Sequence, residues 1–227
     1  YHPPAPDEPI AGQHVPVDKG GEELLGKNPR QIHDIGVSMA FVPEDRLGMG
    51  LVGSMGMADN MMLKTYRSGR GPLLDRKPPR QLAERVKEEL DVLTPSINTP
   101  VRRLSGGNVQ KVLVGREIAQ NPSVLMTAYA VRGLDINTSY TIYNLLTAQK
   151  LKGVAVIYVG EDLDVMMALC DKIMVLCHGR VMGVVHAHKV TKEELGLMMT
   201  GALDLTRKYE DKPAGIARDT LIEEVDQ

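Results

Sequence analysis

The feature that most constrains this chain is a stretch at residues 104–111, Leu-Ser-Gly-Gly-Asn-Val-Gln-Lys. Ser105 is suited to cap a helix, and apolar residues then recur at helical spacing as far as Pro122, which cannot continue a helix. The adjacent Gly106 and Gly107 leave backbone N–H groups uncovered. A helix start of this kind attracts anions, because the N–H groups are free and the dipole is positive there. The stretch therefore predicts a phosphate site, with a plain turn and helix cap as the alternative.

The residues that follow narrow this interpretation. An apolar strand is expected at 124–128, and Arg-Gly-Leu-Asp follows at 132–135. Together these segments resemble the ATP-binding cassette (ABC) ATPases, and more narrowly the C-terminal cassette of importers for simple sugars and nucleosides. The resemblance implies that residues 104–111 are the signature motif, which contacts the γ-phosphate of an ATP held by a partner cassette. The residues expected at that ATP are Ser105, Gly106, Gly107 and Gln110.

A second match is Val-Pro-Glu-Asp-Arg at residues 42–46, with Gly-Leu-Val at 50–52. It is similar to the Q-loop region of the same cassettes, which couples the nucleotide site to the membrane subunit. Glu44 stands in for the usual glutamine, and a charged surface turn is the alternative reading. Asp135 matches the D-loop, which lies across the interface between cassettes, and it is also suited to cap the helix expected at 136–150.

Several departures from the family pattern put ATP hydrolysis by this chain in doubt. The phosphate-loop pattern Gly-x-x-x-x-Gly-Lys-[Ser/Thr] occurs nowhere in the 227 residues, so the fold is expected to lack that segment. Ala128 and Tyr129 occupy the places of the Mg²⁺-positioning aspartate and the catalytic glutamate. Alanine offers Mg²⁺ no ligand, and tyrosine is a poor base at neutral pH. Glu161 stands at the switch-histidine position, where a carboxylate would repel phosphate. We therefore expect no catalytic residue in this chain.

Composition excludes several other function classes. A net charge of −2 gives no electrostatic case for nucleic acid. We expect no membrane span, because no apolar run approaches about 20 residues, and no signal peptide is visible. Cys170 and Cys177 form no Cys-x-x-Cys pair and are expected to be free thiols. A metal site at Cys177 with neighbouring histidines is disfavoured, because the spacings of structural metal sites are absent.

The order of expected elements predicts the fold class. Strands alternate with helices between residues 37 and 176, which indicates an α/β domain with a mostly parallel sheet. A loop is expected at 68–80, followed by a helix at 81–93 that carries Leu82, Val86, Leu90 and Leu93 on one face. The expected organisation is an extended arm at 1–20, a cassette at 21–201 with a helical subdomain at about 60–120, and a tail at 202–227.

These observations lead to one hypothesis and one alternative. The hypothesis is a degenerate cassette of a sugar or nucleoside importer, which supplies its signature motif to a partner's ATP site. The alternative is a structural or regulatory module without nucleotide chemistry; the intact signature favours the first. The resemblance implies ATP bound mainly by a partner cassette and Mg²⁺ bound through it. It implies a second cassette and transmembrane permease subunits as partners, with no nucleic acid. The implied location is cytoplasmic, peripheral on the inner face of the plasma membrane.

Overall fold

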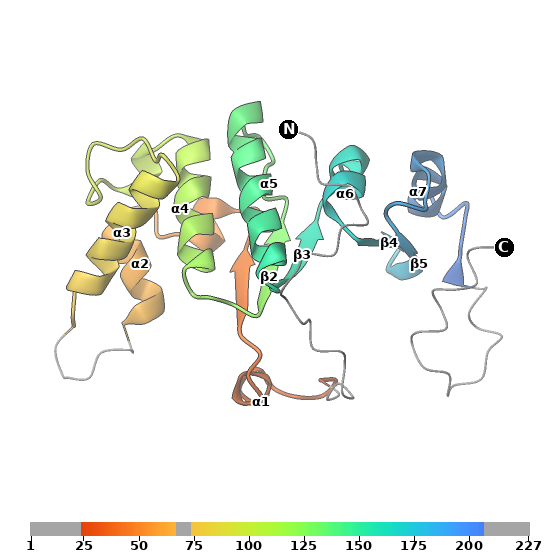
Figure 1. Ribbon diagram of the computed structural model, residues 1–227, viewed down its shortest axis with the longest axis horizontal. Helices are drawn as coiled ribbons and strands as arrows, with labels where there is room; N and C mark the ends of the chain where they lie inside the picture. Colours follow the sequence, from red (N-terminus) through yellow and green to blue (C-terminus); the bar gives the residue numbers. More distant parts are fainter. Residues whose placement is uncertain (1–23, 67–73, 207–227) are drawn as a thin grey trace.

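The computed structural model describes residues 24–66 and 74–206, so the expected arm at 1–20 and residues 207–227 of the expected tail lie outside it. The described strands form two sheets (Figure 1). The first is parallel, in the order β1-β2-β3, and the second is an antiparallel hairpin. The strands are β1 (Met39–Val42), β2 (Val124–Ala128), β3 (Ala155–Val159), β4 (Lys172–Cys177) and β5 (Arg180–His186).

Helices cover the parallel sheet and extend beyond it at both ends (Figure 1). The helices of the described part are α1 (Pro29–Asp34), α2 (Met57–Thr65), α3 (Lys77–Glu89), α4 (Gly106–Ile118), α5 (Ile136–Leu151), α6 (Leu163–Leu169) and α7 (Lys192–Met199). Two short turns accompany them, the π-helical η1 (Arg46–Gly50) and the 3₁₀ turn η2 (Val101–Arg103). No helix within the described ranges combines the length and the apolar character that a bilayer crossing needs.

The parallel register gathers the loops that carry the candidate site residues at one edge of the sheet. Val42 lies opposite Thr127, and Ala128 lies opposite Val159, so the strands end together. The chain returns between strands through α4 and α5, whose N-termini therefore lie near the carboxyl edge. The turn η1 and the loop between β2 and α5 leave the sheet at this same edge.

Two hydrophobic clusters hold the described part together. The larger one lies between the parallel sheet, α4 and α5, and continues between α2, α3 and α4. Its largest fully buried side chains are Met57, Met61, Leu113, Leu125 and Ile142. The smaller cluster joins the hairpin to α7, and Leu203 and Leu205 pack against it from the start of the expected tail.

An open apolar cavity of about 910 Å³ lies between β3 and β4. Both strands line it, and burial beside it raises the pKa of the Tyr158 phenol. In the described part, β3 pairs with β2 alone and β4 pairs with β5 alone. The prediction of a mostly parallel sheet is thus confirmed for β1 to β3, and β4 pairs with β5 in a separate antiparallel hairpin. Gly179, with φ +75°, supplies the left-handed residue of that turn.

The helix expected at 81–93 is displaced toward the N-terminus. It begins at Lys77, because Pro78 and Pro79 occupy its first turn, where a missing N–H costs nothing. It ends at Glu89, and the left-handed Asp91, with φ +47°, prevents its continuation. Leu93 consequently lies beyond the helix and is 71% exposed.

The packing of α4 against α3 depends on a glycine. A Cβ atom at Gly115 would lie 2.6 Å from Val86 Cγ1, whereas a Cβ at Gly196 in α7 would meet nothing within 4 Å. Gly115→Ala should lower the free energy of unfolding, because overpacking costs about 1–3 kcal/mol and outweighs the gain in helix propensity. Gly196→Ala, the matched control, should raise it by about 0.5–1 kcal/mol. Urea unfolding measures both, and equal stabilisation would contradict the packing argument.

The start of α5 provides a pH-dependent prediction. Asp135 caps the helix, and hydrogen bonds from the Thr138 backbone and hydroxyl lower the pKa of its carboxyl. A lowered pKa stabilises the fold above the ordinary aspartate pKa of about 3.9, and this contribution disappears as the pH falls through the lowered value. The difference in urea midpoint between the wild type and Asp135→Asn should therefore shrink as the pH falls from 6 toward 2. A difference that stays constant over this range would contradict the assignment.

Candidate functional site

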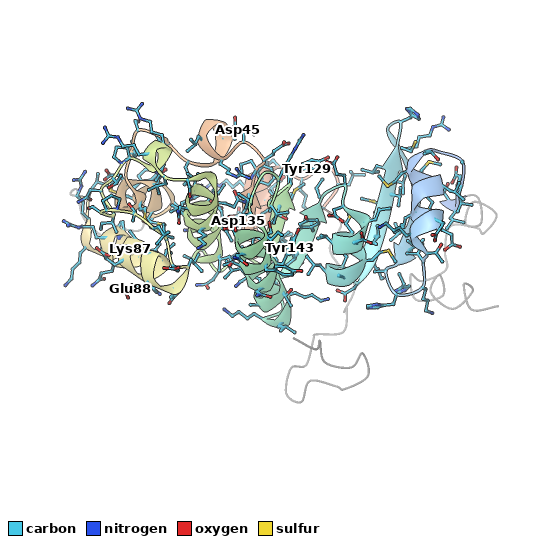
Figure 2. All side chains as sticks on the ribbon, turned by 90° about the horizontal axis from the view of Figure 1, so that it is seen from above. Asp45, Lys87, Glu88, Tyr129, Asp135 and Tyr143 are labelled. Carbon is cyan, nitrogen blue, oxygen red and sulfur yellow. The ribbon has the colours of Figure 1, made fainter. Side chains whose placement is uncertain are left out.

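Two helix N-termini meet at the carboxyl edge of the sheet. Ser105 caps α4, and its Oγ accepts hydrogen bonds from the Asn108 backbone N–H at 3.4 Å and from the Asn108 side-chain amide at 2.8 Å. Asp135 caps α5 and lies near the middle of the molecule when it is seen from above (Figure 2). The first N–H groups of a helix have no acceptor within it, so this edge presents two positive dipole ends.

The two helix starts touch through Gly107. A Cβ atom at this position would lie 3.0 Å from Thr138 Oγ1 and 3.2 Å from Thr138 Cγ2, closer than side chains normally pack. Thr138 is buried, and its hydroxyl donates to Asp135 Oδ2 at 2.7 Å. The absence of a side chain at Gly107 therefore allows α4 to approach the capped end of α5.

Arg46 contacts the first two turns of α4. Its Nε donates to Gln110 Oε1 at 2.8 Å, and another of its nitrogens donates to the carbonyl oxygen of Arg132. A Cβ at Gly106 would lie 3.5 Å from Arg46 Nη1, so this cation faces the helix start. Burial lowers the pKa of the Arg46 guanidinium while the charge of Glu44 opposes the shift, and arginine stays protonated at neutral pH.

Gln110 is fully buried, which differs from a position in direct reach of a ligand. Its Oε1 is used by Arg46, and its Nε2 has no hydrogen-bond partner among the described residues. The exposed side of the site is formed instead by Ser105 and Gly106. A pocket of about 380 Å³ opens there, and its lining comprises Glu44, Asp45, Arg46, Leu47, Leu104, Gly106 and Val109.

Glu44 contacts the loop that precedes α5. Arg132 Nη1 lies 2.6 Å from Glu44 Oε1, with side chains 63% and 47% exposed respectively. An ion pair this exposed contributes at most about 1 kcal/mol. The Arg132 guanidinium also lies 5.8 Å from the centre of the Tyr129 ring. The pair thus orients the Glu44 loop and adds little to stability.

Tyr129 and Glu161 stand apart from the helix starts. Tyr129 has a φ of +50°, a strained backbone for a residue with an aromatic side chain, and its N–H donates to the carbonyl of Val159 at 2.9 Å. Glu161 is exposed and lines the large cavity beside β3, together with Tyr129. No hydrogen bond joins Glu161 to Ser105 in the described ranges. Residues 128–131, Ala-Tyr-Ala-Val, present no carboxylate at the end of β2.

The structure therefore brings together most of the residues singled out from the sequence, whereas Glu161 lines the cavity beside β3. The group that meets at the two helix starts comprises Ser105, Gly106, Gly107, Gln110, Glu44 and Asp135. Sequence reasoning gave no role to Arg46 or Thr138, which connect this group. Two features of the sequence could have pointed to them. Arg46 is the only cation of the 42–46 motif, and Thr138 follows Asp135 by three residues, the spacing at which a cap receives a hydrogen bond from the helix.

In the described residues no cluster of three or more metal-binding side chains occurs. Cys170 and Cys177 are free thiols, and burial raises the pKa of the Cys170 thiol.

Comparison with known proteins gives relatives of one kind, although no family model matches. The chain is 33% identical over 211 residues to the ribose import ATP-binding protein of Streptomyces avermitilis, covering 90% of this chain and 40% of that protein. It is 34% identical over 181 residues to the xylose import ATP-binding protein of Moorella thermoacetica, covering 80% and 36%. It is 35% identical over 203 residues to the guanosine import ATP-binding protein of Bacillus subtilis, covering 88% and 39%. The chain thus spans about two fifths of the length of these relatives.

Solved structures agree at the level of the fold. A dimeric ATP-binding cassette bound to ADP and phosphate superposes with a TM-score of 0.59 at 22% identity, covering 71% of this chain and 68% of that one. An inward-facing metal-chelate type ABC transporter superposes with a TM-score of 0.60 at 17% identity, covering 72% and 64%. The chain therefore has the fold of the ATP-binding cassettes and is a homologue of the ATP-binding proteins of sugar and nucleoside importers.

Proposed function

We propose that this chain belongs to an importer for sugars or nucleosides, where it completes an ATP site on a partner cassette and is degenerate at its own. The observation that carries this proposal is the helix start at Ser105–Gly107 with Arg46 beneath it. Gly106 and Arg46 line an open pocket there, so a phosphate arriving from outside meets a helix N-terminus and a cation. In this arrangement Gln110 acts by holding Arg46.

The degenerate half of the proposal rests on what stands at the end of β2. A cassette that hydrolyses its own ATP needs a carboxylate for Mg²⁺ and a base for the attacking water. Ala128 and Tyr129 supply neither, so this part of the chain does not fit Mg²⁺. Glu161 adds a negative charge where a phosphate would need a neutral or positive group. ATP and its metal would then be bound mainly by the partner.

The membrane side of the proposal rests on the segment after β1. We name residues 46–52, which contain η1, the coupling turn. Leu47, Met49 and Val52 are exposed there, with Met49 73% exposed, next to the Glu44 position. Exposed apolar groups rimmed by charges are typical of protein docking surfaces. The relatives are named as import proteins, which supports permease subunits as the partners and a peripheral position on the cytoplasmic face of a membrane.

A charge at Gly106 tests the phosphate role. In Gly106→Asp a carboxylate would lie beside Arg46, in the place proposed for the γ-phosphate. Two unit charges about 4 Å apart repel by about 4 kcal/mol at an effective dielectric near 20, which corresponds to a loss of about a thousandfold. The variant should fold, because a carboxylate suits a helix N-terminus. Its assembly with a competent partner cassette should lose ATP-driven dimerisation and ATPase activity.

Gly106→Asn is the matched control, since it has nearly the same size without the charge. It should retain clearly more partner ATPase activity than Gly106→Asp at an equal melting temperature. Normal activity of a folded Gly106→Asp protein would show that residues 104–111 form only a helix cap, and it would leave the structural-module alternative standing.

The chain alone should release phosphate from ATP no faster than background. The reason is the chemistry of Ala128 and Tyr129 together with the absence of the phosphate-loop pattern from the sequence. The measurement is Mg²⁺-dependent phosphate release by purified protein over a range of concentrations. Activity that a substitution at Ser105 or Tyr129 abolishes would refute the degenerate half of the proposal.

A further inference from the structure

The coupling turn is attached to α4 at both of its ends. At its start, Arg46 Nε donates to Gln110 Oε1 at 2.8 Å. At the end of η1, the carbonyl oxygen of Gly50 accepts a hydrogen bond of 2.7 Å from Arg116. Between them Leu113 packs so closely that a Cβ at Gly50 would lie 2.8 Å from its Cδ2. Since Gln110, Leu113 and Arg116 follow at intervals of three, one face of α4 contacts η1 at its first and last residues.

The Arg116 side chain is fixed by a buried charge. Glu117 is fully buried, and its Oε1 accepts from Arg116 Nε at 2.9 Å and from a second Arg116 nitrogen at 2.7 Å. Its Oε2 accepts from Lys64 Nζ of α2 at 3.1 Å. Arg116 is itself buried, so its guanidinium is shared between Glu117 and the Gly50 carbonyl. A buried carboxylate with two cationic partners is compensated, whereas one with a missing partner is costly.

Part of the support of the coupling turn is local, because Asp45 accepts hydrogen bonds from the Gly48 N–H through Oδ1 at 2.8 Å and from the Met49 and Gly50 N–H groups through its carbonyl at 3.1 Å. A π-helical turn is a rare conformation that often marks functional sites. Its Leu51 N–H donates to the Arg46 carbonyl at 2.7 Å, and the next residue, Val52, is held by Asn60 of α2 through its N–H at 2.8 Å. The side chains that face outward, Leu47 and Met49, are exposed and contribute little packing. Side chains from α4 and α2 therefore add to the hydrogen bonds that the turn makes with Asp45 and within its own backbone.

We infer that Arg116, oriented by Glu117, is a positioning residue that fixes the coupling turn against the same helix whose N-terminus forms the phosphate site. Movement of α4 would then carry the turn with it as one body. This inference rests on the proposed function only where it concerns the effect of these residues on solute uptake. The positioning itself is a property of the chain and is measurable without nucleotide or partner.

Amide hydrogen exchange at Met49, Gly50 and Leu51 tests the positioning. Arg116→Lys keeps a cation beside Glu117 but loses the planar fork that reaches both Glu117 and Gly50. Arg116→Met combined with Glu117→Gln removes both charges and leaves no uncompensated one. Each should speed exchange of these amides by about tenfold, the effect of one net hydrogen bond, while the urea midpoint changes little. Lys64→Gln is the control, because it touches Glu117 without touching Gly50, and exchange should stay within about twofold of wild type.

Unchanged exchange in a folded Arg116→Lys protein would overturn the inference. Global unfolding of both Arg116 variants would also overturn it, because Arg116 and Glu117 would then stabilise the whole fold and not the turn in particular. In an importer assembled with its membrane subunits, the same variants should lower solute uptake more than ATP hydrolysis, and equal losses would show that the pair does not act through the turn. If the proposed function is wrong, the assembled protein shows no ATP-driven uptake while the exchange result still stands, so the two failures are distinguishable.

Discussion

The hydrogen bond from Arg46 to Gln110 is the contact on which the site depends. It joins the turn after β1 to the first turns of α4, and it places a cation beneath the exposed glycine at position 106. Without it, a half-buried guanidinium and a fully buried amide would both lack their main partner, and unpaired buried polar groups are costly. The bond therefore sets the position of the helix start relative to the sheet, as well as its local charge.

The burial of α4 explains why this helix holds so many neighbours in place. Val109, Val112, Leu113 and Val114 are all buried, together with the polar Gln110, Arg116 and Glu117, so the middle of the helix has no solvent side. A helix buried all round must satisfy each polar side chain internally. Gly107 and Gly115 allow close contact with α5 and α3 on its other faces. Packing and polar contacts thus leave α4 little freedom to move by itself.

The sequence was sufficient where local chemistry decides the structure. The Ser105 and Asp135 caps and the β2 boundaries at 124–128 follow from short patterns, and the structure confirms each of them. The start of α3 was misplaced, since prolines interrupt a helix in its interior but are accepted in its first turn. The roles of Arg46 and Thr138 were not predictable, because each depends on a residue far away in the sequence. Arg46 is bonded to Gln110, and Thr138 packs against Gly107 of another helix.

The free side of β3 has a consequence for how this protein behaves in solution. Within the described residues one edge of the strand carries no partner, and Ile157 on it is 48% exposed. An apolar strand edge with unpaired N–H and C=O groups is a template for a strand from another molecule. Intermolecular strand addition at this edge would bury the apolar wall of the cavity and satisfy the backbone in one step. Such pairing would make self-association increase with protein concentration, and a lysine in place of Ile157 would oppose it.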